Sequence, residues 1–208
     1  MTQQNKTAII TGASKGIGAS IAKRLAEDGF AVVVNYSRSA DEAKKLVREI
    51  EKKGGRAISV QADVGDSNAV RQLFDRAEAE FGNLNVLVNN AGVMQLSSIE
   101  KMDDIAFDDM ITTNFKGVFN GMREAARRLS EGGKIISFSS SVVGIYGPGY
   151  GVYGATKAAV EAMTHVLSKE LGPKKINVNT IAPGPIETDM FLGGKSDELV
   201  ATITRACH

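Results

Sequence analysis

Sulfur and imidazole ligands are nearly absent from this sequence. Its 208 residues include one cysteine, Cys207, so no disulfide can form within the chain. Neither histidine, His165 or His208, belongs to a cluster of cysteines or paired carboxylates, and histidine normally binds metal as part of such a cluster. The sequence therefore predicts no metal site, and a chain with a single cysteine suits the reducing cytosol.

Long apolar runs and an excess of one charge are also missing. No run approaches the roughly 20 apolar residues that a helix needs to cross a bilayer. The start, Met1 to Lys6, lacks the apolar segment of a signal peptide. The net charge is +1, so no strong field draws the chain to nucleic acid or to a membrane surface. These absences predict a cytoplasmic protein that binds neither.

The sequence contains a regular alternation of strand and helix patterns. Its 43% hydrophobic and 24% charged residues are ordinary values for one globular domain, predicted to span 1–208. Alternating apolar strands and helices predict an α/β fold with a doubly wound parallel sheet, covered by helices on both faces. The predicted strands are 7–10, 31–35, 56–61, 85–89, 134–138 and 176–181, and the predicted helices are 19–28, 41–53, 68–81, part of 105–129, and 153–171.

A glycine-rich turn, Thr11 to Gly18, separates the first strand from the first helix. Glycine permits positive φ and a close approach to phosphate, and a helix N-terminus presents unpaired N–H groups to an anion. The turn could bind nothing, but the strand before it and the helix after it favour a nucleotide. It is not a Walker loop, because no Gly-Lys-Ser/Thr follows a four-residue spacer. The residues of this turn expected to bind the nucleotide are Gly12, Ser14, Lys15, Gly16, Ile17 and Gly18.

Polar and glycine residues also follow the later strands. Asn89-Asn90-Ala91-Gly92 follows the fourth strand, a serine run at 139–141 follows the fifth, and 183–188 follows the sixth. Each segment alone has an ordinary explanation as a turn, a cap or a bend. Those explanations do not account for the position that the three segments share. The carboxyl ends of parallel strands meet in the crevice where doubly wound folds bind ligands, so the shared position predicts a binding site.

Tyr153 and Lys157 lie four residues apart in a predicted helix, so their side chains share one face. A phenol normally keeps its proton until pH ~10, and a neighbouring ammonium is expected to lower that pKa. A tyrosine tuned in this way can exchange a proton with a carbonyl or alcohol oxygen near neutral pH. Most tyrosine–lysine pairs of this kind are surface residues, so the pair alone does not indicate catalysis. The motifs in the other loops support a catalytic role for it.

Together these motifs resemble the short-chain dehydrogenase/reductase family, in its single-domain type and in particular its 3-oxoacyl-carrier-protein reductase-like members. The matching features run in order from Lys6 to about Met190. They are the glycine turn, Asn89-Asn90-Ala91-Gly92, Asn114, the serine run, Tyr153 with Lys157, and Pro183-Gly184. The resemblance implies a Rossmann-like three-layer αβα fold and an NADP(H)-dependent oxidoreductase acting on a ketone or secondary alcohol. A nucleotide-binding or truncated family member without catalysis is the second hypothesis.

The resemblance also implies catalytic roles. Tyr153 would donate the proton in ketone reduction and accept it in alcohol oxidation. Lys157 would lower the pKa of this tyrosine and bind the nicotinamide ribose, and Asn114 would hold a water that connects the lysine to solvent. A serine would bind the substrate oxygen. Ser140 has the more common spacing to the tyrosine, whereas Ser141 begins a family-like Ser-x-x-Gly sequence, and both stay candidates.

The same resemblance predicts the nucleotide. NAD enzymes usually carry an acid at the end of the second strand, where this chain has Tyr36, Ser37 and Arg38. Lys15 and Arg38 suit the 2′-phosphate of NADP, although ordinary surface charge is the alternative explanation. The other residues assigned to the cofactor are Asp63 and Val64 at the adenine, Asn90, Ala91, Gly92, Tyr153, Lys157, Pro183, Gly184, Ile186, and Thr188 at the carboxamide.

The sequence does not name the substrate. Its candidate pocket residues form a moderately apolar set, which favours a small-molecule carbonyl or alcohol of that character. They are Met94, Gln95, Val142, Tyr146, Tyr150, Met190 and Phe191.

Members of the family usually continue beyond the position of His208 with a last strand. The resemblance therefore implies that this strand is missing and that 176–181 forms a sheet edge, which favours association with other chains. A homo-oligomer is expected for a full-length form and is doubtful for this short chain.

Overall fold

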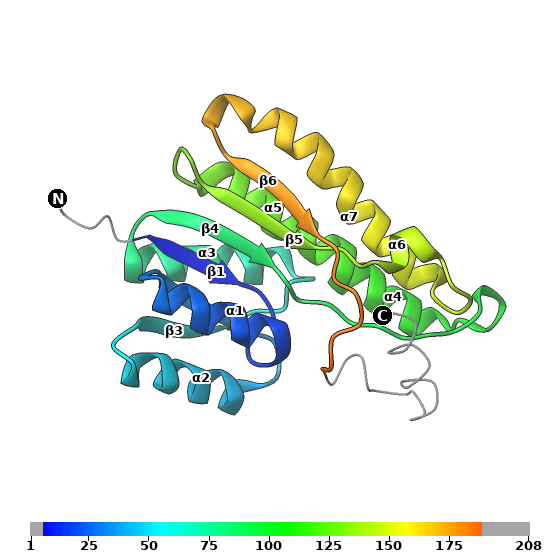
Figure 1. Cartoon of the computed structure of the whole chain (residues 1–208), viewed down its shortest axis with the longest axis horizontal. Helices are drawn as coiled ribbons and strands as arrows, with labels where there is room; N and C mark the ends of the chain where they lie inside the picture. The colour runs from blue at the N-terminus through cyan, green and yellow to red at the C-terminus, as the bar shows by residue number, and fades with distance from the viewer. Residues whose placement is uncertain (1–5, 189–208) are drawn as a thin grey trace.

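A single parallel sheet forms the centre of the molecule (Figure 1). The computed structural model describes residues 6–188, and in that range the strands hydrogen-bond in the order β3-β2-β1-β4-β5-β6. Each neighbouring pair is parallel. The strands are β1 (Thr7–Ile10), β2 (Ala31–Tyr36), β3 (Arg56–Gln61), β4 (Leu84–Asn89), β5 (Lys134–Phe138) and β6 (Asn177–Ile181).

Helices cover both faces of this sheet and enclose two apolar cores. The main helices are α1 (Gly16–Glu27), α2 (Ala40–Lys52), α3 (Ser67–Phe81), α5 (Gly117–Arg128) and α7 (Gly151–Glu170). In β1, Ile9 packs into the core with α3, α5 and α7, whereas Ala8 and Ile10 pack into the core with α1 and α2. This alternation is what a strand buried on both faces requires. The predicted doubly wound, three-layer α/β fold is confirmed.

The predicted strands agree with the observed ones to within one residue at each end, but the predicted helical stretch 105–129 is divided. It contains α4 (Asp104–Met110), a π-helical turn η2 (Ile111–Lys116) and then α5. π-helical turns are rare in proteins, and those that occur often lie at functional sites. The first helix also starts earlier than predicted, at Gly16 instead of Ala19. Shorter elements are η1 (Ile99–Lys101), α6 (Val142–Ile145) and η3 (Gly172–Lys174).

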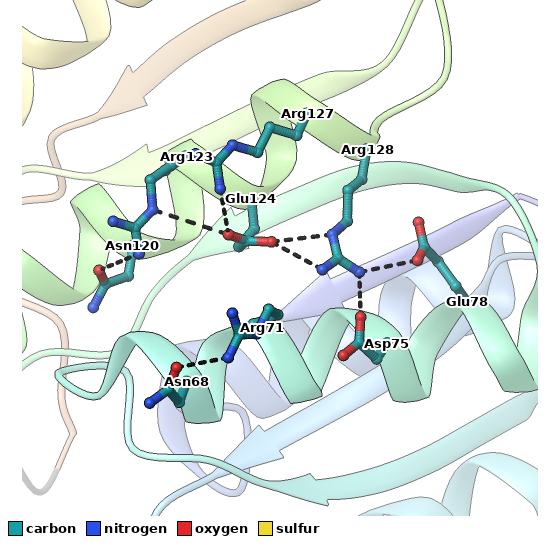
Figure 2. Close-up of polar contacts among 9 residues, drawn as sticks. All are labelled: Asn68, Arg71, Asp75, Glu78, Asn120, Arg123, Glu124, Arg127 and Arg128. Atoms are coloured by element: carbon teal, nitrogen blue, oxygen red, sulfur yellow. Dashed lines mark hydrogen bonds and ion pairs between the residues drawn. The ribbon is translucent and has the colours of Figure 1, made fainter.

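An arginine that binds a buried carboxylate joins α5 to α3 (Figure 2). Glu124 of α5 is 3% exposed and accepts hydrogen bonds from Arg127 at 3.2 Å and Arg128 at 3.0 Å. Arg128 also donates to Asp75 at 2.6 Å and Glu78 at 3.0 Å, both on α3. Several partners are needed to offset the lost hydration of a buried ion pair. The network therefore holds α5, and the π-helical turn before it, against the body of the domain.

β6 is the outermost strand on its side of the sheet within residues 6–188, with β5 as its strand neighbour. The candidate pocket residues Met190 and Phe191 lie outside the described residues. Within the described range, no helix is long and apolar enough to cross a membrane. The same range has no group of histidine, cysteine, aspartate or glutamate side chains that could hold a metal ion.

Candidate active site

The strand order reverses between β1 and β4. β1, β2 and β3 extend to one side of this point, and β4, β5 and β6 extend to the other. The connections after β1 and β4 therefore diverge, and open α/β sheets bind ligands at the carboxyl ends of the strands at such a point. The loops that carry the sequence motifs follow β1, β4, β5 and β6, so all of them leave this edge.

The glycine turn after β1 packs directly against the loop after β4. Gly12 and Gly16 adopt φ values of +60° and +58°. A Cβ atom on Gly12 would lie 2.8 Å from Ala91 Cα, and one on Gly18 would lie 2.5 Å from Asn90 Nδ2. That amide nitrogen donates to the Gly12 carbonyl at 3.0 Å. A side chain at Gly12 or Gly18 would push the two loops apart.

The start of α1 is suited to an anion. Its N-cap residue, Lys15, makes no side-chain hydrogen bond to the first turn, and that turn contains no acidic residue. Lys15 and Gly16 are exposed, and Ser14 and Ile17 are half-buried. Close-packed glycines before a helix N-terminus are the arrangement that receives the pyrophosphate of a dinucleotide.

Two polar side chains that the sequence analysis did not single out hold this turn. Asn35, at the end of β2 and 1% exposed, accepts the Gly12 N–H at 3.1 Å and donates to the Ala62 carbonyl at 3.0 Å. The Thr11 hydroxyl accepts two backbone N–H groups of the loop after β4, each at 3.0 Å. The sequence offers one signal for Asn35, an amide at the end of the otherwise apolar strand β2. A buried amide requires hydrogen-bond partners, so this position indicates a residue that fixes its neighbours.

Tyr153 and Lys157 lie on the buried face of α7 and are 8% and 4% exposed. Lys157 Nζ is 5.6 Å from the centroid of the Tyr153 ring and donates to the carbonyl of the last residue of β5 at 2.9 Å. The side chain of Ser140 lies near enough to that of Tyr153 to act on the pKa of the phenol. Ser141 donates its N–H to the Pro183 carbonyl at 3.0 Å, which joins the loops after β5 and β6. The structure thus brings Ser140 to the phenol.

Burial governs the protonation of this pair. Loss of hydration raises the pKa of Tyr153, the Ser140 side chain opposes that rise, and Tyr150 adds to it. Burial also lowers the pKa of Lys157 to about 8. The pKa of Tyr153 thus moves opposite to the direction expected from the Lys157 ammonium, because desolvation dominates, and the effect of Lys157 on the phenol stays a prediction. Tyr153 keeps its proton at neutral pH, as a proton donor must.

Asn114 is fully buried within the π-helical turn. Its Oδ1 accepts the Val93 N–H and its Nδ2 donates to the Val93 carbonyl, both at 2.8 Å. A Cβ atom on Gly92 would lie 3.3 Å from Asn114 Oδ1 and 3.7 Å from Lys157 Nζ. Asn114 and Lys157 therefore border the same stretch of the loop after β4. The water expected between them stays a prediction.

The end of β2 carries the residues expected at the 2′-position of the nucleotide. Tyr36 is half-buried, and Ser37 and Arg38 are exposed. Gln61 of β3 donates to the Ser37 carbonyl at 2.9 Å and fixes this turn. β1 and β2 are neighbours, so Lys15 and Arg38 follow the carboxyl ends of adjacent strands. Both cations thus lie at the edge where a nucleotide on the glycine turn would extend.

The two residues expected at the adenine differ in exposure. Asp63 is exposed, and its Oδ1 accepts the Gly65 N–H at 2.9 Å. Val64 is 6% exposed and belongs to the apolar core, where a Cβ atom on Gly117 would lie 2.6 Å from its Cγ2. A contact between Val64 and a nucleotide would therefore involve its backbone.

The segment after β6 lies across the start of α1. Thr188 Cγ2 would be 3.8 Å from a Cβ atom on Gly16. Ile186 and Thr188 line a cleft of about 540 Å³ together with residues of α1 that include Gly16, Ile17 and Ser20. The structure thus brings the two cofactor candidates of this segment beside the glycine turn.

Comparison with known proteins decides the family. The family model described as short chain dehydrogenase matches residues 6–198. The chain belongs to this family. A versicolorin reductase (stcU) of Emericella nidulans is 45% identical to this short-chain dehydrogenase over 188 residues, covering 90% of this chain and 71% of the relative. The 3-oxoacyl-(acyl-carrier-protein) reductase FabG of Staphylococcus aureus is 42% identical over 199 residues, covering 95% and 80%.

A solved structure agrees with this assignment. The short chain dehydrogenase of Burkholderia cenocepacia in complex with NADP matches with a TM-score of 0.89 at 41% identity, over 95% of this chain and 81% of that one. The resemblance to short-chain dehydrogenases, including reductases of the 3-oxoacyl type, is confirmed. As a member of this family the chain is an oxidoreductase.

Proposed function

We propose that this short-chain dehydrogenase transfers a hydride between NADP(H) and a ketone or secondary alcohol. The observation that carries the proposal is the buried Tyr153 phenol, with the half-buried Ser140 and the buried Lys157 beside it, at the edge of the sheet that carries the glycine turn. The reductase names of two relatives and the NADP complex of a solved one support the same class of reaction.

The roles of the side chains follow from their protonation and contacts. The cofactor supplies the hydride. Tyr153 donates its proton to the substrate oxygen that hydride transfer leaves negative, and burial keeps that proton in place at neutral pH. Ser140 gives the same oxygen a second hydrogen bond. Lys157 binds the cofactor ribose, and Asn114 supports the return of a proton through water.

Exposed apolar side chains lie near the first turn of α7, which carries the proposed proton donor. Ile99, Ile145 and Tyr146 are 79%, 75% and 65% exposed. Ile99 Cγ1 would be 3.0 Å from a Cβ atom on Gly151, and Tyr146 Cδ1 would be 3.9 Å from one on Gly154, so these side chains adjoin the first turn of α7. An apolar rim suits an uncharged substrate, such as a 3-oxoacyl chain or another apolar ketone.

A substrate panel tests this function. NADPH consumption is measured over aliphatic ketones, aromatic ketones and 3-oxoacyl thioesters. Turnover of an apolar ketone or a 3-oxoacyl thioester is expected. NADPH binding without turnover of any of them would favour a nucleotide-binding protein without catalysis.

Arg38→Asp is expected to reverse the cofactor preference. The wild type should bind NADPH more tightly than NADH, because a guanidinium suits a 2′-phosphate and the strand end carries no acid. Loss of a charged hydrogen bond and gain of a like charge should weaken NADPH binding by about 10-fold to 100-fold. Fluorescence titration of both cofactors measures the change, with Arg48→Asp on the exposed side of α2 as the control. Equal affinities of the wild type for both cofactors would contradict the proposal.

Ser140→Ala and Ser141→Ala form a matched pair of variants. Removing the hydroxyl of Ser140 should lower kcat by about 10²–10³-fold, as expected for a donor to the reacting oxygen. Ser141→Ala keeps the backbone bond to Pro183 and should stay near the wild type. Steady-state reduction with saturating NADPH measures both. If Ser141→Ala shows the larger loss, the donor is Ser141.

A further inference from the structure

Thr156 is a buried polar residue with no part in the reaction proposed above. It lies between Tyr153 and Lys157 on α7 and is 1% exposed. Its hydroxyl donates to the Tyr153 carbonyl at 2.7 Å and accepts from Asn114 Nδ2 at 3.3 Å. α7 packs against the π-helical turn that carries Asn114. One hydroxyl therefore joins two elements that meet at the candidate active site.

The single hydroxyl proton of Thr156 sets the direction of both bonds. Because that proton goes to the Tyr153 carbonyl, the oxygen acts as an acceptor toward Asn114, whose amide nitrogen must then face α7. The same nitrogen donates to the Val93 carbonyl, and the amide oxygen accepts the Val93 N–H. Both hydrogens of the amide thus have an acceptor, as a buried amide requires. The result is a continuous chain of hydrogen bonds from the loop after β4 to α7.

The loop held by this chain borders the ammonium of Lys157. A Cβ atom on Gly92 would lie within 4 Å of both Asn114 Oδ1 and Lys157 Nζ, at 3.3 Å and 3.7 Å. A shift of Asn114 relative to α7 would therefore move this loop against the catalytic pair. Small displacements of reacting groups lower a reaction rate steeply.

We propose that Thr156 is a positioning residue, whose hydroxyl cross-links Asn114 to the helical turn that carries Tyr153 and Lys157. The kinetic consequence of this cross-link rests on the proposed oxidoreductase function. The cross-link itself concerns the folded chain alone and can be measured without turnover.

A second threonine of α7 provides a matched control. Thr164 is 6% exposed, and its hydroxyl has no hydrogen-bond partner among the described residues. Valine at either position keeps the shape of the side chain and removes a buried hydroxyl, but only at Thr156 does the change break hydrogen bonds. Thr156→Ser keeps the hydroxyl and removes the methyl group.

The test compares Thr156→Val, Thr156→Ser and Thr164→Val in steady-state reduction with NADPH and in hydrogen exchange of the Val93 N–H. Thr156→Val should lower kcat by about 10-fold to 100-fold, leave the KM for NADPH nearly unchanged, and speed exchange at Val93. Thr156→Ser should keep most of the wild-type kcat, and Thr164→Val all of it. Thr156→Ala enters the same comparison if the valine variant does not fold.

Two kinetic results would overturn the proposal. One is a kcat of Thr156→Val equal to that of Thr164→Val. The other is an equal loss in Thr156→Ser, which would assign the effect to the methyl group. If the wild type reduces no substrate, the proposed function fails and exchange at Val93 decides alone. Faster exchange in Thr156→Val then supports the cross-link, and unchanged exchange overturns it.

Discussion

Tyr153→Phe is expected to lower kcat for ketone reduction by about 10²–10⁴-fold, the contribution of general acid catalysis. Only the hydroxyl is removed, and the ring stays in its buried site on α7. NADPH affinity and Tm should stay close to wild type, because the glycine turn and the core are untouched. Steady-state kinetics, a cofactor titration and a thermal melt on the same preparation measure the three quantities. A variant that keeps most of the wild-type rate would show that Tyr153 is not the proton donor.

A double variant sharpens this test. If the Tyr153 and Ser140 hydroxyls act on one substrate oxygen, their contributions are not independent. Tyr153→Phe combined with Ser140→Ala should therefore lose little more rate than Tyr153→Phe alone. Losses that simply multiply would mean that the two hydroxyls serve different steps.

The parts of the fold and site that were predictable from the sequence depend on local patterns. Short apolar runs, or apolar residues that alternate with polar ones as in β3 and β6, marked each strand to within one residue at each end. The glycine turn and the Tyr153–Lys157 pair depend on spacing along a single strand–turn–helix or a single helix. The serine choice stayed open because adjacent positions are equally close in sequence, and the role of Ser140 stays a prediction.

The parts that were missed depend on contacts between distant segments. Asn35 bonds a carbonyl 27 residues away, and the Asn114 amide reaches Thr156 across 42 residues. A pattern of neighbouring residues in the sequence does not indicate hydrogen-bond partners that far apart. The π-helical turn within 105–129 was invisible for the same reason, since its buried Asn114 is satisfied by the loop after β4.

The direction of the Tyr153 pKa shift was also beyond a local argument. The sequence shows an ammonium one turn away, which favours the phenolate, but it does not show the burial of the phenol. In the structure burial prevails and the pKa of Tyr153 rises. The consequence is a tyrosine that keeps its proton at neutral pH.

Lys157→Met is expected to stabilise the folded chain while lowering its activity. Burial lowers the pKa of Lys157 from its ordinary 10.5 to about 8. That shift corresponds to about 3 kcal/mol of unfavourable free energy for holding the ammonium in the fold at neutral pH. Methionine keeps the apolar stem but leaves the Phe138 carbonyl without its donor, which costs about 1–2 kcal/mol. The free energy of unfolding should therefore rise by about 1–2 kcal/mol.

The stability gain should depend on pH in a defined direction. The unfolded chain binds a proton at Lys157 up to its ordinary pKa, whereas the folded chain binds it only up to pH about 8. Wild-type stability therefore rises with pH between these values. Lys157→Met lacks this rise, so its advantage should shrink by about 1 kcal/mol between pH 7 and pH 9. The raised pKa of Tyr153 affects stability only at pH values above 9, outside the range compared.

Urea titrations of both proteins at pH 7 and pH 9 measure the effect. Lys169→Met removes an exposed ammonium from the same helix and should change stability by less than about 0.5 kcal/mol at either pH. A stabilised Lys157→Met with a low kcat would mean that the fold keeps a buried cation for the reaction at the expense of stability. A variant less stable than wild type at pH 7, or a difference that is the same at both pH values, would contradict the burial of the ammonium.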